Sequence, residues 1–421
     1  MEAYRFKEHT DEYQTIQSLK KEKYHMFFSK EHKGKDVSLP CYTLTKDHDN
    51  SYHIKTGYFI GIDWLDINDS YLCIKPKLNT SGKQIDFIQI LFNALQHEEI
   101  SEKVKELVYI QWDAKHIPIE QKEDILTPFL IAEFLALVTA RVRKGLKKSY
   151  YPVLRKLNAR VKGKLLVSKT IKHNISKSQA LNTYCSYEEF GLNTPENKLL
   201  KKTLLYIQEY LSTVTHTPSK VKLVEKLNYV LPAFSTVSND IDTHSSKNLK
   251  HNAFYQEYKE ALHLADLILK RFGYNIENAS SKLVGIPPFW IDMSKLFELH
   301  VYSLLKKGFG NGVSYHDRFN GREIDFLLNT EKIKMIIEAK YKPRWKDTIV
   351  FEDIQQLSTY ARMKSIYNEL GIEKDKIIEA LIVYPNLTDG ELNTTSENVK
   401  SVNLRDYVSF YKLGVKMPLI A

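Results

Sequence analysis

The 421-residue sequence is poor in cysteine and has no long apolar run, and both absences narrow the class of protein it can encode. The three cysteines, Cys41, Cys73 and Cys185, are odd in number and widely separated, which argues against a disulfide framework and against a cysteine-based zinc site. No apolar segment reaches the length that spans a bilayer, and the first residues contain no apolar signal core. We therefore expect a cytoplasmic protein with no membrane association.

Two further absences concern nucleotides and acidic residues. The sequence has no Gly-x-x-x-x-Gly-Lys-[Ser/Thr] motif, so we do not expect this chain to power translocation itself. No Asp or Glu lies between Glu133 and Glu188, whereas thirteen Lys or Arg lie in residues 141–177. Such a basic segment is typical of a surface that neutralises a phosphate backbone; a solvated surface or a contact for an acidic protein partner are the alternatives. Its candidate DNA-binding residues are Arg141, Arg143, Lys144, Lys147 and Lys148.

Length and composition predict an α+β protein of several domains. The chain is 43% hydrophobic and 27% charged, which is ordinary for a globular protein, and its length suffices for two or three domains. Strand-like runs between turn residues predict a β-rich N-terminal domain over residues 1–115. Helical periodicity predicts a mainly helical, basic middle region over residues 116–285. Residues 286–421 carry the motif that points to chemistry.

That motif consists of two short apolar runs, residues 322–328 and 333–340, which predict a β-hairpin. Asp325 lies within the first run, and Glu338 and Lys340 end the second. Because side chains alternate between the faces of a strand, Glu338 and Lys340 share a face. We expect one face of the hairpin to belong to the core and the other to carry two carboxylates and an ammonium group.

These charges suit a particular reaction, because charged side chains on apolar strands are costly unless they are paired, solvated or bound to a metal. Two carboxylates can hold Mg²⁺, and a lysine beside them can orient or deprotonate water for phosphodiester cleavage. An acid, twelve residues and then Glu-x-Lys resembles the PD-(D/E)xK, or restriction-endonuclease-like, nuclease superfamily. The alternative is an amphipathic edge hairpin whose Asp325, Glu338 and Lys340 make surface ion pairs.

The flanking segments predict the rest of such a core. An upstream helix with Ser294 as its N-cap would bring Glu298 toward the polar face of the hairpin, although a solvated position for Glu298 is the alternative. A downstream helix would place Gln356 and Tyr360 on one face, four residues apart. With a buried strand over residues 377–385, the order helix, strand, strand, helix, strand predicts an α/β PD-(D/E)xK core.

Over roughly residues 50–390 the chain resembles McrC, the nuclease subunit of McrBC-type modification-dependent, 5-methylcytosine-specific restriction systems. Besides the nuclease core, the segments that carry the resemblance are Gly-Tyr-Phe-Ile-Gly at 57–61, Ile-Lys-Pro-Lys at 74–77, Arg-Lys-Gly-Leu at 143–146 followed by Tyr150, Val-Lys-Gly-Lys at 161–164, Cys-Ser-Tyr-Glu-Glu-Phe at 185–190 and residues 193–201. The resemblance implies an endodeoxyribonuclease of antiviral defence that uses Mg²⁺ or Mn²⁺. It implies cleavage of methylated double-stranded DNA only in complex with a hexameric McrB-type AAA+ GTPase, which binds the GTP and whose hydrolysis this chain stimulates.

Carried over residue by residue, the resemblance also implies the site. The implied catalytic residues are Asp325, Glu338, Lys340, Glu298 and Gln356, with Tyr360 bordering them. The implied metal ligands are Asp325, Glu338 and the carbonyl of Ala339. Lys342, Arg344 and Lys346 form a basic loop beside them and are further candidate DNA contacts. One departure is Ile324, where many members of the family have proline before the first acid.

Other interpretations of the sequence stay open. One is a free-standing repair or structure-specific nuclease without a GTPase, and another is a non-catalytic adaptor that retains the nuclease scaffold. The resemblance implies that residues 1–115 bind the partner, and the charged stretch 20–35 is expected to be a plain loop, with an insertion finger as the alternative. One site per chain predicts that two copies pair for double-strand cleavage.

Overall fold

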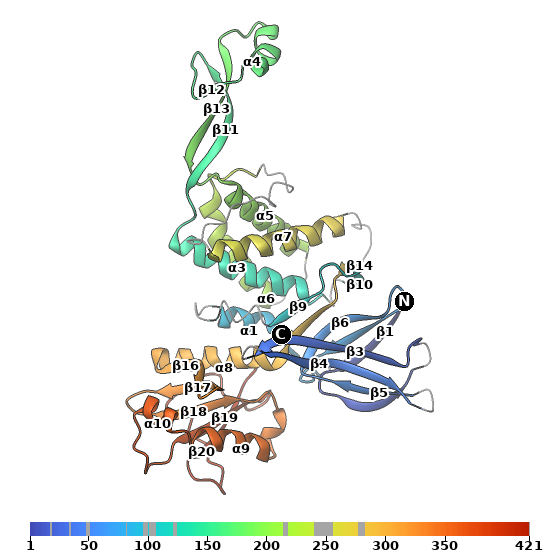
Figure 1. The fold of residues 1–421 in the computed structure, drawn as a ribbon, viewed down its shortest axis with the longest axis vertical. Helices are drawn as coiled ribbons and strands as arrows, with labels where there is room; N and C mark the ends of the chain where they lie inside the picture. The colour runs from blue at the N-terminus through green and yellow to red at the C-terminus, as the bar shows by residue number, and fades with distance from the viewer. Residues whose placement is uncertain are drawn as a thin grey trace. The chain divides into compact units, whose positions relative to one another are not determined.

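The computed structural model shows a mixed α/β architecture with several sheets (Figure 1). It describes the chain except for residues 17–18, 33–34, 48–50, 81, 96–99, 101–106, 121–123, 214–217, 240–255, 277–282 and 421. The described residues form two compact units. One comprises residues 1–129 and 279–421, and the other comprises residues 130–278. The predicted boundaries near residues 115 and 285 stay a prediction.

The N-terminal part of the first unit is built from two larger sheets and two short ones. In sheet order, the five-stranded sheet contains β1 (Glu2–Lys7), β7 (Ser70–Lys75), β6 (Phe59–Asp66), β15 (Phe289–Asp292) and β9 (Val108–Ile110). The four-stranded sheet contains β2 (Asp11–Thr15), β5 (Ser51–Thr56), β4 (Lys35–Lys46) and β3 (Lys23–His32). The short pairs are β10 (Ile117–Glu120) with β14 (Leu283–Ile286), and β8 (Gln84–Ile85) with β21 (Leu419–Ile420).

These two larger sheets share one apolar core. Leu44 and Ile54 of the four-stranded sheet pack in the same buried cluster as Leu72 and Trp290 of the five-stranded sheet. Alternating apolar residues along each strand supply this core, as expected of sheets with one buried face. The prediction of a loop for the charged stretch 20–35 is wrong, because apolar residues alternate with its charged ones. Its described part contains β3, in which Tyr24 and Phe28 are buried.

The C-terminal part of the first unit is a second five-stranded sheet with helices on both faces. In sheet order its strands are β16 (Val313–Phe319), β17 (Arg322–Asn329), β18 (Lys334–Ala339), β19 (Glu379–Pro385) and β20 (Phe410–Val415). β17 is antiparallel to both of its neighbours, β16 and β18, whereas β18, β19 and β20 run parallel to one another. In Figure 1, helix α8 (Met293–Phe309) lies along one face, and α9 (Phe351–Tyr360) and α10 (Lys364–Leu370) lie along the other.

Burial of both faces corrects the prediction of one apolar and one polar face for the hairpin β17–β18. Every residue of β18 from Met335 to Ala339 is buried. Phe326 stacks on Tyr302 of α8, whereas Ile336 belongs to the cluster that packs under α9 and α10. A strand covered on both faces has a continuous apolar run, and the charged residues are confined to its end.

The start of α8 also differs from the prediction. The side chain of Asp292, and not that of Ser294, caps the helix by accepting a 3.0 Å hydrogen bond from the Lys295 N–H. Asp292 ends strand β15. Strand and helix are therefore joined without a loop, which fixes the direction in which α8 crosses the sheet.

The second unit contains a helical cluster and a three-stranded sheet. Among the described residues its helices include most of α3 (Leu126–Lys144), α4 (Val167–His173), α5 (Pro195–Thr213), α6 (Pro218–Val230) and α7 (Gln256–Ile276). Helix α1 (Phe87–Ala94) belongs to the first unit. The sheet contains β11 (Ser149–Asn158), β13 (Asn182–Gly191) and β12 (Lys164–Leu165). None of the helices in the described residues combines the length and the apolar character needed to cross a membrane.

Candidate active site

The strands β17 and β18 separate at the two acidic residues. Their backbone pairing ends at Phe326 and Ile337, so Asp325 and Glu338 are the first positions beyond it. There the backbone N–H of Ala339 donates a 2.9 Å hydrogen bond to Oδ2 of Asp325. A side chain thus takes the place of a ladder partner, and both carboxylates lie at the point where the strands diverge.

Glu338, Lys340 and Gln356 form a closed ring of hydrogen bonds. The Lys340 ammonium donates to Oε1 of Glu338 and to Oε1 of Gln356, each at 2.9 Å. Nε2 of Gln356 donates to the same Glu338 oxygen at 2.9 Å and to the hydroxyl of Tyr360 at 3.1 Å. The helical spacing of Gln356 and Tyr360 therefore brings both residues of α9 to the hairpin, as the sequence predicted.

The second carboxylate oxygen of Glu338 takes no part in this ring. The side chain of Glu338 is 4% exposed, and among the described side chains its Oε2 is a buried atom with no hydrogen-bond partner. A buried carboxylate oxygen without a partner is costly, and such atoms are uncommon in folded proteins. A hard divalent cation would satisfy it, so the residues present fit a metal at this position.

The electrostatics of the site also favour a cation. Burial raises the pKa of Asp325 well above its ordinary value, and the charges of Glu338 and Glu298 raise it further. The pKa of Glu338 is raised as well, chiefly by burial, although the Lys340 charge opposes this. Burial alone would lower the pKa of Lys340, but the charges of Glu338 and Asp325 outweigh it and the pKa is raised. Lys340 is therefore a cation at neutral pH, and the carboxylates still favour more positive charge.

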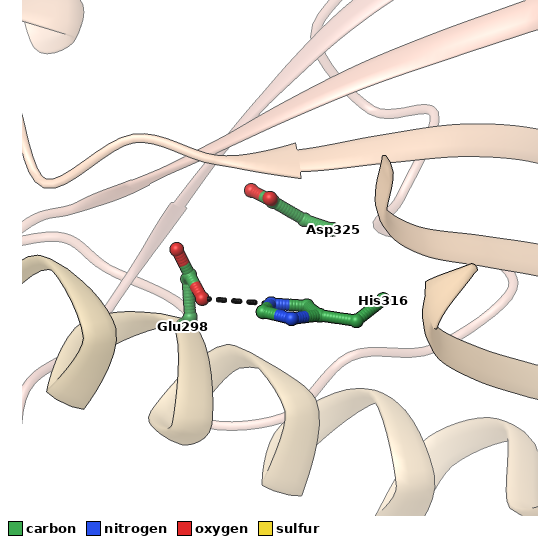
Figure 2. A group of neighbouring side chains, drawn as sticks. All are labelled: Glu298, His316 and Asp325. Carbon is green, nitrogen blue, oxygen red and sulfur yellow. Dashed lines mark hydrogen bonds and ion pairs between the residues drawn. The ribbon is translucent and has the colours of Figure 1, made fainter. Parts of the chain in front are cut away.

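A second group of polar residues adjoins the hairpin. Glu298 extends from α8, and its Oε2 lies 3.1 Å from Nε2 of His316 on β16 (Figure 2). Nδ1 of His316 lies 2.8 Å from Oε1 of Glu323, and this hydrogen bond holds the pKa of Glu323 well below its usual range. Ligand atoms of Glu298, His316 and Asp325 all lie within 4.8 Å of one another, so these three residues could hold a metal ion.

Sequence reasoning missed His316 and Glu323. No strand was predicted over residues 313–319, because the apolar and polar residues of that segment stop alternating at Asp317. Glu323 belongs to the predicted hairpin but lies two residues before Asp325 and outside the motif. His316 could not be recognised from the sequence, because its partners Glu298 and Glu323 lie on other elements.

Apart from Lys340 and Ala339, these groups border one cavity of about 290 Å³. Its lining residues are Asp292, Ser294, Lys295, Glu298, His316, Arg322, Glu323, Asp325, Glu338, Gln356 and Tyr360. A larger depression of about 730 Å³ lies elsewhere, around Gly308 and Thr394, and has no comparable cluster of acids. The smaller cavity is the one that combines space with the chemistry described above.

The predicted basic loop after β18 divides into residues with different surroundings. Lys342 pairs with the buried carboxylate of Asp353 at 2.7 Å, and Trp345 donates to the other oxygen of that carboxylate at 2.8 Å. Lys346 pairs with the exposed Asp389 at 2.9 Å. The side chain of Arg344 is exposed. Lys342 is thus part of the packing, whereas Arg344 presents its charge to solvent.

The candidate DNA-binding residues of the second unit divide in the same way. Arg141 is 8% exposed and lies over the ring of Tyr258, and Lys147 pairs with Glu196 at 2.6 Å in largely buried surroundings. Exposed positions are held by Arg143, Lys144 and Lys148. Burial makes Arg141 and Lys147 less suited to a phosphate contact than these three, and DNA binding by the group stays a prediction.

Comparisons with known proteins complete the description of the site. Residues 54–385 match the family described as McrBC 5-methylcytosine restriction system component. Among solved structures, the chain is similar at 16% identity and a TM-score of 0.39 to a refined half-complex from a tetradecameric assembly of Thermococcus gammatolerans McrB AAA+ hexamers with bound McrC, covering 87% of this chain and 79% of that chain. It is similar at 20% identity and a TM-score of 0.29 to the cryo-EM structure of the Thermococcus gammatolerans McrBC complex, covering 60% of this chain and 67% of that chain. No curated protein matches.

Proposed function

The chain belongs to the family of McrBC 5-methylcytosine restriction system components, and we propose that it is the DNA-cleaving subunit of such a system. The observation that carries this proposal is the unpartnered Oε2 of Glu338, which lies in one cavity with Asp325 and beside Lys340. Among the described residues Glu8 also has a buried carboxylate oxygen without a partner, so Glu338 is distinguished by the second acid in its cavity and by the adjacent lysine.

The fold supports the same interpretation. In the C-terminal sheet the hairpin β17–β18 continues into parallel strands β19 and β20, with a helix on each face. We assign this arrangement to a PD-(D/E)xK core in which Asp325 and Glu338 lie just beyond the point where β17 and β18 stop pairing. Ile324 in place of proline removes no ligand, because neither side chain can bind a metal. The Ile324 side chain is fully buried in the core cluster.

Each residue has a role in phosphodiester hydrolysis. Asp325, Glu338 and the carbonyl of Ala339 would hold Mg²⁺ or Mn²⁺, which supplies Lewis acidity and lowers the pKa of a bound water. The raised pKa keeps Lys340 protonated, so it orients water and offsets phosphate charge by donating hydrogen bonds. Gln356 accepts a hydrogen bond from the Lys340 ammonium and donates one to the Glu338 oxygen that the ammonium contacts, and thereby fixes the direction of the ammonium.

DNA contact is proposed for the exposed basic residues. In the second unit these are Arg143, Lys144 and Lys148, within a segment that lacks acidic residues from 134 to 187. Beside the candidate site the corresponding residue is Arg344. Exposed surface cations of this kind release counterions when they meet phosphates, which supplies affinity without sequence preference.

We further propose that the chain acts with an McrB-type AAA+ GTPase hexamer that binds GTP, and that it stimulates GTP hydrolysis. The family is described as a component of a system, and this sequence has no phosphate-binding Gly-x-x-x-x-Gly-Lys-[Ser/Thr] motif of its own. Recognition of the methylated base would then belong to the partner. Pairing of two copies would allow both DNA strands to be cut.

A reconstitution experiment tests this function. Methylated and unmethylated plasmids are incubated with Mg²⁺ and the chain alone, with the GTPase added, and with GTPase and GTP. We expect cleavage of methylated plasmid in the complete mixture only, lost in Asp325→Ala and Lys340→Ala. Lys332→Ala, an exposed lysine of the hairpin turn, is the matched control and should cleave normally.

Other outcomes of that experiment would point elsewhere. Cleavage by the chain alone would favour a free-standing nuclease. An intact plasmid in every mixture, with the proteins bound to each other, would favour an adaptor that keeps the nuclease scaffold. Cleavage that survives Asp325→Ala would overturn the assignment of the site.

A further inference from the structure

We propose that His316, Glu298 and Asp325 form a cation position with a nitrogen ligand, which selects a transition metal such as Mn²⁺ over Mg²⁺. This position adjoins the one at Glu338 and shares Asp325 with it. The proposal deepens the nuclease function proposed above and rests on it for the identity of the site. What it adds is an imidazole ligand, His316, which is not part of the Asp and Glu-x-Lys motif.

The three side chains converge from separate elements. Glu298 comes from α8, His316 from β16 and Asp325 from β17, and Figure 2 shows them directed toward one another. Their candidate ligand atoms lie within 4.8 Å of one another. Ligands at about 2.1 Å from a metal lie up to about 4.2 Å apart when they are opposite, so a small contraction would bring all three within reach of one cation.

The backbone turns His316 into this position. Strand pairing joins Tyr315 to Phe326 and Asp317 to Ile324, which sets His316 directly across from Asp325. His316 itself has a φ of 57°, in the left-handed region that residues other than glycine rarely adopt. An L-residue keeps such a conformation inside a strand only where surrounding contacts hold it, and for His316 these are its contacts with Glu298 and Glu323.

Glu323 orients the imidazole. Its Oε1 lies 2.8 Å from Nδ1 of His316, and its Oε2 accepts a 3.0 Å hydrogen bond from Arg318. A histidine that ligates a metal through one nitrogen usually donates its other N–H to a carboxylate in this way. Glu323 is therefore a positioning residue, which directs Nε2 of His316 toward Glu298 and Asp325.

The surrounding charge distinguishes a ligand set from an ordinary ion pair. Three carboxylates, of Glu298, Glu323 and Asp325, surround one imidazole whose side chain is only 12% exposed. Glu323 is also paired with Arg318, so a protonated imidazole would balance only one of the other two carboxylates, Glu298 and Asp325. Glu338 lines the same cavity, and its buried, unpartnered Oε2 is a further acceptor for a cation there.

The donor set determines which cation fits. Carboxylates alone suit Mg²⁺, which is reluctant to exchange water for nitrogen, whereas imidazole favours first-row transition metals. A site with two carboxylates and one imidazole therefore favours Mn²⁺ when both metals compete. Mg²⁺ would still be accepted at the position built from Asp325, Glu338 and Ala339.

The test measures metal binding directly, without DNA. Mn²⁺ is titrated into the full chain by electron paramagnetic resonance, and electron spin-echo modulation of the bound Mn²⁺ reports a coordinated ¹⁴N nucleus. We expect ¹⁴N modulation in the wild type and its loss in His316→Asn and His316→Gly. The affinity for Mn²⁺ should fall at least about tenfold in both variants. Asn and Gly both tolerate the left-handed backbone, so folding is preserved. His25→Ala, an exposed histidine of β3, is the matched control and should bind normally.

Two variants of Glu323 separate orientation from packing. Glu323→Ala should weaken Mn²⁺ binding about tenfold and change the ¹⁴N signal, because the imidazole loses its acceptor. Glu323→Gln keeps an acceptor oxygen and should restore most of the affinity. Equal losses in both variants would contradict the positioning role.

The outcomes separate this proposal from the proposed function. Absence of ¹⁴N modulation in the wild type, or its persistence in both His316 variants, overturns the nitrogen ligand, and cleavage with Mg²⁺ by the reconstituted complex would then leave the nuclease intact. Modulation that depends on His316 without cleavage in any mixture would establish the cation position and overturn the nuclease. Failure of the wild type to bind Mn²⁺ also overturns the proposal.

Discussion

The hydroxyl of Tyr341 donates a 2.7 Å hydrogen bond to Oε1 of Glu8, which lies 333 residues earlier in the chain. Both side chains are buried, at 3% and 1% exposure. The backbone N–H of Lys77 donates to the same carboxylate oxygen at 3.1 Å, and the Lys77 ammonium donates to the Tyr341 carbonyl at 3.0 Å. Because Tyr341 directly follows Lys340, this network ties the N-terminal strands to the end of the strand that carries the candidate catalytic lysine.

Removal of the Tyr341 hydroxyl should destabilise the first unit. Oε2 of Glu8 already has no hydrogen-bond partner among the described atoms, so Tyr341→Phe leaves the buried carboxylate with one backbone donor. We expect the free energy of unfolding to fall by about 1 to 3 kcal/mol, measured by urea denaturation. Tyr13→Phe, at a tyrosine that is 64% exposed, is the control and should change it by less than about 0.5 kcal/mol. Equal effects would show that the hydrogen bond contributes nothing.

The same network predicts a pH dependence of stability. Burial raises the pKa of Glu8 from 4.5 to about 7, against the opposing charge of Lys77. A folded-state pKa above the unfolded value means that the folded state binds the proton more tightly, so this stabilisation is complete below pH 4.5 and is lost as pH rises through 7. Relative to Glu8→Gln, the wild type should lose up to about 3 kcal/mol of unfolding free energy between pH 4.5 and 7. Parallel pH curves for the two proteins would contradict this.

Gln356 should matter for cleavage beyond its place on α9. Gln356→Ala removes the acceptor that holds the Lys340 ammonium and one donor to Glu338. We expect the cleavage rate of the reconstituted complex to fall by about a hundredfold. Gln355→Ala changes the neighbouring exposed glutamine and should leave the rate unaltered. A similar rate for both variants would remove Gln356 from the site.

Lys342 and Arg344 should behave oppositely although only one residue separates them. Lys342→Ala leaves the carboxylate of Asp353 buried without its ion pair, which should cost about 3 to 5 kcal/mol of unfolding free energy. Arg344→Ala should leave stability within about 0.5 kcal/mol, since its side chain is exposed. If Arg344 contacts a phosphate, its loss should reduce the slope of log affinity for DNA against log salt by about 0.9, measured by fluorescence anisotropy. An unchanged slope would exclude that contact.

The parts of the candidate site that follow from local periodicity could be predicted from the sequence. Glu338 and Lys340 lie two residues apart at the end of a strand, and Gln356 and Tyr360 lie four residues apart on a helix, so their spacing alone places each pair on one face. The structure brings both pairs together through the ring of hydrogen bonds at Glu338. Their catalytic roles stay predictions.

The parts that depend on contacts between distant segments could not be predicted. His316 lies beside Asp325 only because β16 pairs with β17 in a particular register. The sequence pattern of residues 313–319 does not predict a strand. Asp292 and Ser294 are both good helix caps, and the choice between them depends on where β15 ends in its sheet. Burial of the second face of β18 likewise depends on α9, which lies later in the chain.

The position of β15 has a consequence for how the protein is made. This strand, residues 289–292, pairs with β6 on one side and with β9 on the other, so the sheet begun by the first 110 residues is incomplete until the ribosome has passed residue 292. Residues 130–278, by contrast, form their own compact unit and are synthesised first to last without interruption. The second unit is therefore continuous in the chain, whereas the five-stranded sheet of the first unit has its full set of strands only after residue 292 has been synthesised. Shortened chains that end before residue 289 would lack both the nuclease region and the strand that closes the N-terminal sheet.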